Sequence, residues 1–266
     1  MNQHKELSLE SLKKIEFDML VHIRDFCEQH KLSYFLSNGT LLGAVKYKGF
    51  IPWDDDIDIL MPREDYDYLV EHYEDSGNYQ LFVPERVREY AFPFAKLCDM
   101  TTRKEETYNN NGVELGVDID IFPLDVWDKN PSKQAKKQMR TMILLRHSKI
   151  KHASAKNPLK SIMKKVSSVF CKMLGAPFFI NRMQKCATSS REKSDKVGCI
   201  VWPVYGLKEI IPAKVFSDTV EVTFEGEKFS APIGYDEYLR CLYGDYEQDP
   251  PLEKQKTHHK FIAYRI

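Results

Sequence analysis

Apolar residues recur at helical spacing through the N-terminal segment of the chain. These positions are Leu12, Ile15, Met19, Ile23 and Phe26. Intervals of three and four residues place their side chains on one face of a helix, and Ser8 just before them is a favourable N-cap. The pattern therefore predicts a long helix over residues 9–32 with one face in a core.

Short apolar runs separated by turn residues follow this helix, which is typical of strands and short helices. Strands are expected at 32–37, 56–60, 79–83, 94–100 and 116–122. Short helices are expected at 38–49, at 62–74 after Pro62, and at 235–244. Alternation over 220–232 around Glu225–Gly226 predicts a hairpin, and 244–261 reads as an irregular tail.

The middle of the chain is strongly basic. Residues 129–191 hold 16 Lys and Arg and no Asp or Glu, whereas the rest of the chain holds all 39 acidic residues against 23 basic ones. The basic segment reads as helical in about three pieces, broken near Pro158 and Pro177. We therefore predict one mixed α/β domain over 1–266, with a core of 1–128 and 192–266 and a basic helical insertion at 129–191.

Composition excludes several classes of protein. With 42% hydrophobic and 29% charged residues, the 266-residue chain is ordinary for a soluble globular protein. Its apolar runs fall short of the roughly 18–20 residues that span a membrane, and its first residues contain no apolar signal-peptide core. The six cysteines are scattered without a C-x-x-C pair, so we expect reduced thiols, no structural zinc site and a cytoplasmic protein.

The stretch WDDDIDIL at residues 53–60 gathers four carboxylates at the start of an apolar strand. Strands are normally poor in Asp, and like charges this close repel each other. On a strand, Asp56 and Asp58 share one face while the intervening isoleucines point into the core. Two such carboxylates suit a hard divalent cation such as Mg²⁺, whereas Asp54 and Asp55 are expected to cap or turn the backbone. The alternative is an acidic loop that runs into an edge strand.

Two neighbouring motifs favour the metal interpretation. SNGTLLGAV at 37–45 places a glycine and a hydroxyl residue at a helix start, where backbone N–H groups suit a phosphate; a plain helix N-terminus is the alternative. GVDIDIFPLD at 116–125 repeats the acidic alternation, with Asp118 and Asp120 between isoleucines. A second acidic strand would supply a third carboxylate, and three carboxylates can hold two cations that bridge phosphates.

The order of these motifs resembles the polymerase-β-type nucleotidyltransferase fold. The longer stretch SNGTLLGAVKYKGFIPWDDDIDILMPREDY is similar to the signature of the LicD family of phosphocholine transferases, which are related to fukutin and fukutin-related protein. IDIFPLD, FEGEKFSAP, and YGDYEQDPP followed by two histidines also resemble later blocks of that family. The resemblance runs from about residue 10 to residue 260, and the basic segment is its least characteristic part.

The resemblance implies specific roles for residues of this chain. Asp56, Asp58 and Asp120 would bind Mg²⁺ or Mn²⁺, and Asp118 ranks lower because the family usually has an apolar or aromatic residue there. The implied nucleotide and phosphate-binding residues are Ser37, Asn38, Gly39, Thr40, Gly43 and Lys46. Lys46 stands where many family members have Arg and would neutralise a phosphate as a point charge.

The resemblance also implies a reaction. Members take a CDP-activated alcohol, CDP-choline in the type case, and transfer the phospho-alcohol to a sugar hydroxyl while CMP leaves. The acceptor would be a glycan or lipid-linked glycan precursor of the teichoic acid or lipopolysaccharide type. Asp120 and Asp125 are candidates for the general base, and His258 is a weaker one.

A choline cargo calls for an aromatic cage around its quaternary ammonium. The aromatic residues that flank the signature blocks are Tyr47, Trp53, Trp202, Tyr205, Tyr243 and Tyr246. Each is also a plausible core or rim residue. Phosphoglycerol, phosphoribitol or phosphoethanolamine would need no cage, so the cargo stays open at this point.

Two other functions and three uses of the basic segment are consistent with the sequence. A true nucleotidyltransferase would deliver NMP and release pyrophosphate, and an inert core would make the chain an adaptor. The basic segment would be a solvated face, a nucleic-acid site or a contact with anionic lipid. Because apolar and basic residues mix over 139–151 and 159–179, we expect peripheral contact with the inner face of the membrane and no nucleic-acid binding.

Overall fold

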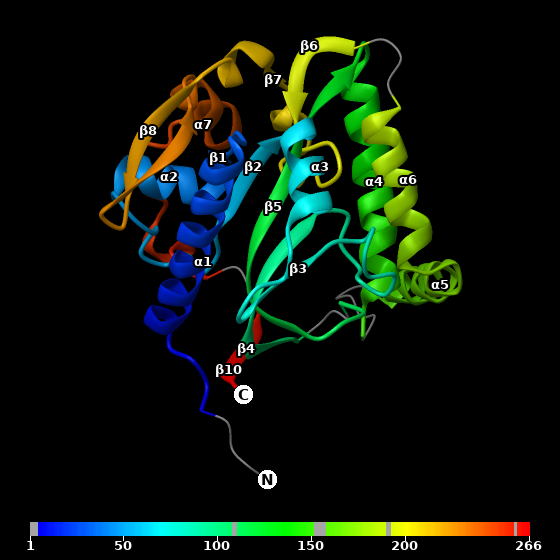
Figure 1. Ribbon diagram of the computed structural model, residues 1–266. Coiled ribbons are helices and arrows are strands. Elements are labelled where there is room, and N and C mark those ends of the chain that lie inside the picture. The colour runs from blue at the N-terminus through cyan, green and yellow to red at the C-terminus, as the bar shows by residue number, and fades with distance from the viewer. Residues whose placement is uncertain (1–4, 108–110, 152–157, 190–192, 258–259) are drawn as a thin grey trace.

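A mixed eight-stranded sheet carries the fold, seen in a computed structural model that describes residues 5–107, 111–151, 158–189, 193–257 and 260–266 (Figure 1). The strands are β1 (Phe35–Leu36), β2 (Asp58–Pro62), β3 (Tyr79–Phe82), β4 (Ala95–Glu106), β5 (Leu115–Asp128), β6 (Lys193–Gly198), β7 (Ile211–Pro212) and β10 (Phe261–Arg265). The main path is β1-β2-β5-β4-β10, while β3 pairs with β4, and β6 pairs with β5 and β7. Strands β2 and β5 are parallel, and the other described pairs are antiparallel, so the predicted mixed α/β class is confirmed.

Helices surround this sheet, with a separate hairpin to one side. They are α1 (Leu9–His30), α2 (Asn38–Lys46), α3 (Arg63–His72), α4 (Pro131–Lys149), α5 (Pro158–Leu174), α6 (Ala176–Thr188) and α7 (Tyr235–Tyr243). Short 3₁₀ helices lie at Gly206–Glu209, Ala213–Phe216 and Leu252–Lys254, and the hairpin comprises β8 (Thr219–Phe224) and β9 (Glu227–Pro232). Figure 1 shows α4, α5 and α6 together on the right, with the hairpin and α7 on the left. Within the described residues, none of the helices is long and apolar enough to cross a membrane.

The long first helix packs on the sheet as its apolar spacing predicts. Ser8 caps α1 by accepting a hydrogen bond from the backbone N–H of Ser11. Met19 and Ile23 are fully buried, and α1 contacts β4 and β5. The side chains between the acids of β2 and β5 are also buried, so the isoleucines anchor both acidic strands in the core.

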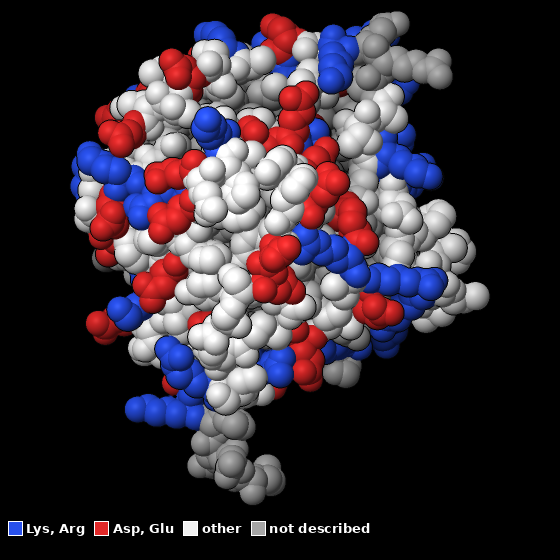
Figure 2. All heavy atoms as spheres, in the orientation of Figure 1, with Lys and Arg blue, Asp and Glu red and all other residues white. Residues whose placement is uncertain are grey.

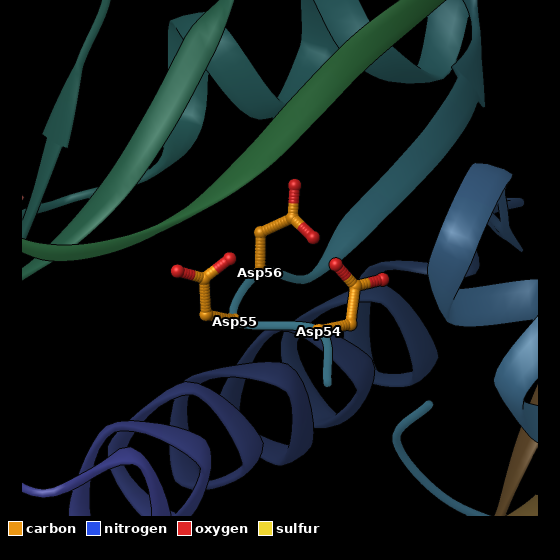
Figure 3. A group of neighbouring side chains, drawn as sticks. All are labelled: Asp54, Asp55 and Asp56. Carbon is orange, nitrogen blue, oxygen red and sulfur yellow. The ribbon is translucent and has the colours of Figure 1, made fainter. Parts of the chain in front are cut away.

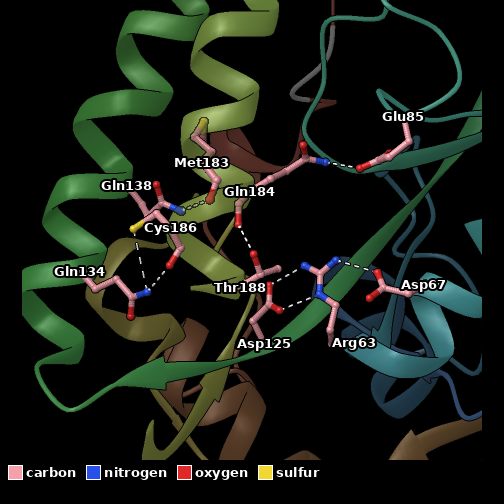
Figure 4. Close-up of polar contacts among 10 residues, drawn as sticks. All are labelled: Arg63, Asp67, Glu85, Asp125, Gln134, Gln138, Met183, Gln184, Cys186 and Thr188. Carbon is pink, nitrogen blue, oxygen red and sulfur yellow. Dashed lines mark hydrogen bonds and ion pairs between the residues drawn. The ribbon is translucent and has the colours of Figure 1, made fainter. Parts of the chain in front are cut away.

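The basic segment forms a helical layer joined to the sheet at one place. β5 leads into α4 and α6 leads into β6, and Asp128 of β5 pairs with Lys193 of β6. Within the layer, Gln134 Nε2 donates to the carbonyl of Cys186 at 2.8 Å, and Gln138 Nε2 donates to that of Met183 at 2.9 Å (Figure 4). These bonds fix α4 against α6, while the division into core and insertion stays a prediction.

Three local expectations differ from the structure. β4 and β5 are longer than predicted, and β10 pairs with β4 beyond the segment expected to be irregular. β2 begins at Asp58, so Asp56 lies in the loop before it. β1 pairs with β2 only at Phe35 and Leu36, opposite Leu60 and Ile59, and the chain then enters α2. Asp56 therefore has no residue of β1 opposite it.

Candidate active site

Two acidic residues and a lysine form a row across the centre of the sheet. In the parallel register Asp58 of β2 lies beside Asp120 of β5, and Asp120 lies beside Lys96 of β4. Asp58 is 9% exposed, and the backbone N–H of Asp120 donates to the carbonyl of Ile57 at 2.9 Å. Acidic groups predicted from separate motifs therefore meet at one site.

A cavity of about 1180 Å³ opens over this row. Its acidic lining comprises Asp54, Asp56, Asp58, Asp118 and Asp120, together with Glu106, Asp245 and Asp249. The remaining lining includes aromatic residues and the cations Lys46, Lys96, Lys104, Arg146, Lys149 and Lys260. The cavity is large enough for a nucleotide-like ligand, and its lining contains both carboxylates and cations.

The loop before β2 gathers three further carboxylates (Figure 3). One oxygen each of Asp54, Asp55 and Asp56 lies within 4.8 Å of the other two. Asp55 is buried, whereas Asp54 and Asp56 are partly exposed and line the cavity. The structure thus places the loop carboxylates beside the strand carboxylate of Asp58 rather than on one strand with it.

The start of α2 holds Asp58 in position. Asn38 Nδ2 donates to Asp58 Oδ2 at 3.0 Å, and Asn38 Oδ1 accepts from the hydroxyl of Tyr238 at 3.0 Å. Thr40 Oγ1 accepts from the backbone N–H of Asp58 at 2.8 Å. Side chain and backbone of Asp58 are therefore both fixed by one helix.

Burial makes the ionised form of these acids costly. Burial raises the pKa of Asp58 well above its usual value, the charges of Asp56 and Asp120 raise it further, and the hydrogen bond from Asn38 offsets part of the rise. Burial also raises the pKa of Asp120, against the opposing charge of Lys96. A bound cation favours the ionised carboxylates, so this oxygen-rich donor set fits a hard divalent ion.

Asp118 has a different environment from its neighbours. Lys96 Nζ lies 2.5 Å from Asp118 Oδ2 and also pairs with Asp120, and Lys104 Nζ lies 2.7 Å from Asp118 Oδ1. Burial alone would raise the pKa of Asp118, but Lys104 and Lys96 outweigh it and hold the pKa below its usual value. Asp118 therefore acts as the counterion of two buried lysines.

Known proteins are similar to this chain in sequence. The family model for the LicD/FKTN/FKRP nucleotidyltransferase domain matches residues 31–163. Lipopolysaccharide cholinephosphotransferase LicD of Haemophilus influenzae is 32% identical over 276 aligned positions, which cover 98% of this chain and 99% of that protein. The chain belongs to the LicD family. Uncharacterised proteins of Rickettsia typhi and Rickettsia prowazekii are 38% and 40% identical over 65 residues, covering 24% of this chain and 19% and 22% of their own.

The phosphate-binding residues implied by the LicD resemblance separate into two groups. Asn38, Gly39 and Lys46 line the cavity. A Cβ on Gly39 would come 2.5 Å from Asp54 Oδ2, so glycine there lets the acidic loop approach α2. Lys46 Nζ pairs with Asp249 Oδ1 at 2.6 Å, which ties the C-terminal tail to the cavity.

The other implied phosphate residues lie behind the cavity wall. Thr40 is buried and bonded to Asp58, as described above. A Cβ on Gly43 would lie 2.4 Å from the carbonyl oxygen of Gly49, so Gly43 allows close backbone packing. Ser37 is the N-cap residue of α2, and its buried hydroxyl has no hydrogen-bond partner among the described residues. We therefore assign Thr40 and Gly43 to the support of the site rather than to ligand contact.

All six aromatic residues proposed for a choline cage line the cavity. Protein cations already lie over three of the rings: Lys46 over Tyr47, Arg146 over Trp202 and Arg240 over Tyr246. Within the described part of the chain, the rings of Trp53, Tyr205 and Tyr243 have no such contact. The hydroxyls of Tyr205 and Tyr243 lie 2.8 Å apart, so this pair and Trp53 are the best placed for a cationic ligand.

Asp125 is not brought together with the other carboxylates. It does not line the cavity, and Arg63 holds it in a two-point ion pair, with Nε–Oδ1 and Nη2–Oδ2 distances of 2.8 Å each (Figure 4). This pairing gives Asp125 a structural role that needs no part in catalysis. His258, the weaker candidate base, lies outside the described residues.

Sequence reasoning missed the basic side of the cavity. Lys96 and Lys104 come from β4, and Arg146 and Lys149 come from α4. A lysine inside the apolar run FAKLCDM was a usable signal for Lys96, because an unpaired lysine is rarely buried in a strand. The α4 cations had no local signal, since they sit among many other cations of the basic segment.

Proposed function

We propose that this protein transfers phosphocholine from CDP-choline to a hydroxyl of a cell-surface glycan precursor of the teichoic acid or lipopolysaccharide type, releasing CMP in a reaction that needs a divalent metal ion. The observation that carries the proposal is one cavity in which a carboxylate cluster and uncovered aromatic rings face the same space. The full-length similarity to a protein named lipopolysaccharide cholinephosphotransferase supports it.

The chemical step exchanges the phosphoanhydride bond of the donor for a phosphoester bond to the acceptor. The acceptor oxygen attacks the phosphorus that carries choline, a new oxygen–phosphorus bond forms, and the bond to the bridging oxygen of CMP breaks. The hydroxyl proton leaves to a base or to solvent. Asp56, Asp58 and Asp120 would hold Mg²⁺ or Mn²⁺, and the bound cation would neutralise charge on the diphosphate oxygens.

Residues of the chain orient this reaction. Asn38 and Thr40 fix Asp58, and Gly39 in the first turn of α2 lines the cavity, where its backbone N–H would donate to a phosphate of the donor. Lys46, held by Asp249, adds a positive charge nearby. Trp53, Tyr205 and Tyr243 would enclose the quaternary ammonium, a contact worth about 1–2 kcal/mol when desolvated.

A CMP-release assay tests the reaction class and the cargo. Purified protein with Mg²⁺ would be incubated with CDP-choline, CDP-ethanolamine, CDP-glycerol or CDP-ribitol, with and without extracted glycolipid. CMP from CDP-choline, absent in Asp58→Asn and normal in Asp195→Asn, is the expected result, because the side chain of Asp195 is 86% exposed on β6. CMP from another donor would change the cargo, and pyrophosphate from a nucleoside triphosphate would favour the alternative nucleotidyltransferase.

We also propose that the helical layer lies on anionic lipid at the cytoplasmic face of the membrane. The described part of α5 exposes seven large apolar side chains, and Figure 2 shows uncharged atoms over this helix with basic residues beside them. The exposed residues are Ile162, Met163, Val166, Val169, Phe170, Met173 and Leu174. Next to them, a groove of about 1230 Å³ combines apolar residues of α5 and α6 with Lys133, Lys136, Lys137, Arg140 and Arg182. Apolar side chains flanked by cations are complementary to an anionic bilayer, because the apolar groups can enter the membrane while the cations contact the lipid headgroups.

Vesicle sedimentation tests this contact. We expect wild-type protein at low salt to sediment with vesicles containing phosphatidylglycerol and to stay in solution with pure phosphatidylcholine. The double variant Phe170→Glu/Met173→Glu should lose most of the binding, whereas Leu252→Glu, on an 82% exposed residue far along the chain, should not. Equal sedimentation of both variants would contradict the proposed docking face.

A further inference from the structure

A buried lysine without a carboxylate partner faces the cavity from the helical layer. Lys149 is the last residue of α4, is 5% exposed and lines the cavity. Among the described residues no carboxylate lies within ion-pair distance of its ammonium. The ammonium lies over the ring of Phe92, with Nζ 3.2 Å from the ring centroid. An ammonium that is buried and unpaired is costly, so this position is not explained by the stability of the fold.

A second cation stands one turn earlier on the same helix. Arg146 also lines the cavity, and its guanidinium carbon lies 5.1 Å from the centroid of the Trp202 ring. No described carboxylate pairs with Arg146 either. The rings of Phe92 and Trp202 are neighbours at 6.3 Å, so aromatic faces rather than acids support both cations.

The two cations lie at the β4 side of the acidic row. Lys96, which pairs with Asp118 and Asp120, also lies over Phe92, with Nζ 4.8 Å from the ring centroid. Lys149 therefore shares a ring with a lysine that touches the acidic row. Burial is the largest cause that keeps the pKa of Lys149 well below its usual value, and the positive charges of Lys96 and Arg146 add to it, while the charges of Glu106 and Asp120 oppose it. An anion bound here would relieve both the burial and the repulsion.

We propose that Lys149 and Arg146 form a phosphate-binding subsite that holds a phosphate group of the acceptor while the carboxylates and α2 hold the donor. The assignment to the acceptor rests on the proposed function, whereas the existence of the subsite does not. Two features favour the acceptor over the donor. The subsite lies across the acidic row from α2, and it is built by the helical layer that also carries the proposed membrane face.

The assignment specifies the acceptor class as a phosphate-bearing glycan precursor. Attack by a hydroxyl close to that phosphate would bring two anionic groups together at the site. Lys149 and Arg146 would neutralise the acceptor phosphate and place its hydroxyl toward the carboxylate row. They are positioning residues in this scheme, since neither touches the reacting atoms.

Phosphate binding in the presence of CMP tests the subsite. Inorganic phosphate would be titrated into the Mg²⁺-loaded full-length protein with and without saturating CMP, for wild type, Lys149→Met, Arg146→Met and the control Lys185→Met, an exposed lysine on α6. We expect phosphate to bind alongside CMP, at least tenfold more weakly in Lys149→Met, and within twofold of wild type in Lys185→Met. CMP affinity should stay within twofold in all variants. Because a buried unpaired charge is removed, the Tm of Lys149→Met should hold or rise.

Three results would overturn the proposal. Unchanged phosphate binding in both Lys149→Met and Arg146→Met would remove the subsite. Displacement of phosphate by CMP, with CMP weakened as much as phosphate in Lys149→Met, would assign the cations to the donor. A fall in kcat with unchanged phosphate binding would make Lys149 a proton acceptor. Absence of CMP release from every donor in wild type would refute the proposed function alone, because the phosphate titration needs no turnover.

Discussion

Asp58 and Asp120 lie side by side as paired residues of the parallel strands β2 and β5. Two carboxylates this close, in a site that is largely buried, repel each other unless a cation is bound between them or one is protonated. We expect Asp58→Asn and Asp120→Asn each to lower CMP release by about 10³-fold or more, as for other losses of charge stabilisation. Thermal unfolding should show equal or higher stability for Asp58→Asn, because that change removes like-charge repulsion. Asp120→Asn also removes an ion-pair partner of the buried Lys96, so its stability should be lower than that of Asp58→Asn.

The Asp195→Asn variant controls for a general effect of losing a carboxylate. Wild-type activity in a correctly folded Asp58→Asn protein would contradict the metal-dependent reaction and favour an inert core. Activity would be compared per folded molecule, with circular dichroism as the check on folding.

Asn38 connects α2 to Asp58, the proposed metal ligand on β2. Its backbone has φ 46°, a left-handed conformation that Asn and Gly tolerate, so Asn38→Gly removes the side chain without straining the backbone. Loss of the 3.0 Å bond to Asp58 should weaken Mn²⁺ binding by about 10–100-fold, the usual effect of removing a hydrogen bond behind a metal ligand. Calorimetric titration with Mn²⁺ measures it.

Tyr238→Phe is a milder variant for comparison with Asn38→Gly. It removes only the hydroxyl that donates to Asn38 Oδ1, so the metal affinity should fall less than in Asn38→Gly. An unchanged affinity in Asn38→Gly would show that metal binding by Asp58 does not depend on the hydrogen bond from Asn38.

The Arg63–Asp125 pair should matter for stability and not for catalysis. The side chain of Asp125 is 4% exposed, and Arg63→Leu would leave its charge buried and unpaired. We expect a loss of about 3–5 kcal/mol in the free energy of unfolding, measured by urea denaturation. The matched variant Asp125→Asn should keep its activity per folded molecule, and a large fall in its kcat would restore Asp125 as a candidate base.

Glu16 on α1 should make stability depend on pH. It is fully buried, neither carboxyl oxygen has a hydrogen-bond partner among the described residues, and burial raises its pKa well above the usual value despite the nearby Lys104. As pH rises past the ordinary carboxyl pKa, the unfolded chain loses this proton while the folded chain keeps it. Stability from this group therefore falls as pH rises, by up to about 1.4 kcal/mol per pH unit, until the raised folded pKa is reached.

Glu16→Gln should remove this slope and leave the protein more stable than wild type at neutral pH. Urea denaturation of both proteins between pH 5 and pH 8 would reveal the difference, on the order of the slope just given. Parallel pH profiles for the two proteins would mean that Glu16 is ionised in the folded state.

Local sequence patterns predict the parts of the site that lie on strands and helices. Alternation of acids and isoleucines was enough to place Asp58 and Asp120 on buried strands, and the order of motifs suggested that the strands meet. The helical period also predicts that the side chains of Asn38 and Thr40 point in different directions, because a step of two residues is a rotation of about 200° around the helix axis. The structure shows this separation, with Asn38 at the cavity and Thr40 behind it.

Contacts made by distant segments could not be read in the same way. Asp249 reaches Lys46, and Lys149 reaches Phe92, through packing of the tail and of the helical layer on the sheet. β10 was missed because the charged, proline-containing stretch before Phe261 reads as irregular, whereas the exposed edge of β4 supplies its backbone partners. Such pairings depend on tertiary geometry and not on the local sequence.

The basic segment leaves the sheet at Asp128 and returns at Lys193, its paired neighbour. A loop whose two ends already meet can be lengthened, shortened or exchanged at small entropic cost, and the strands that carry Asp58 and Asp120 would stay in register. The wall that carries Arg146 and Lys149 can thus change while the strands of the acidic row keep their shape. If the proposed acceptor subsite is correct, transplanting residues 129–191 between relatives should change which molecule is modified.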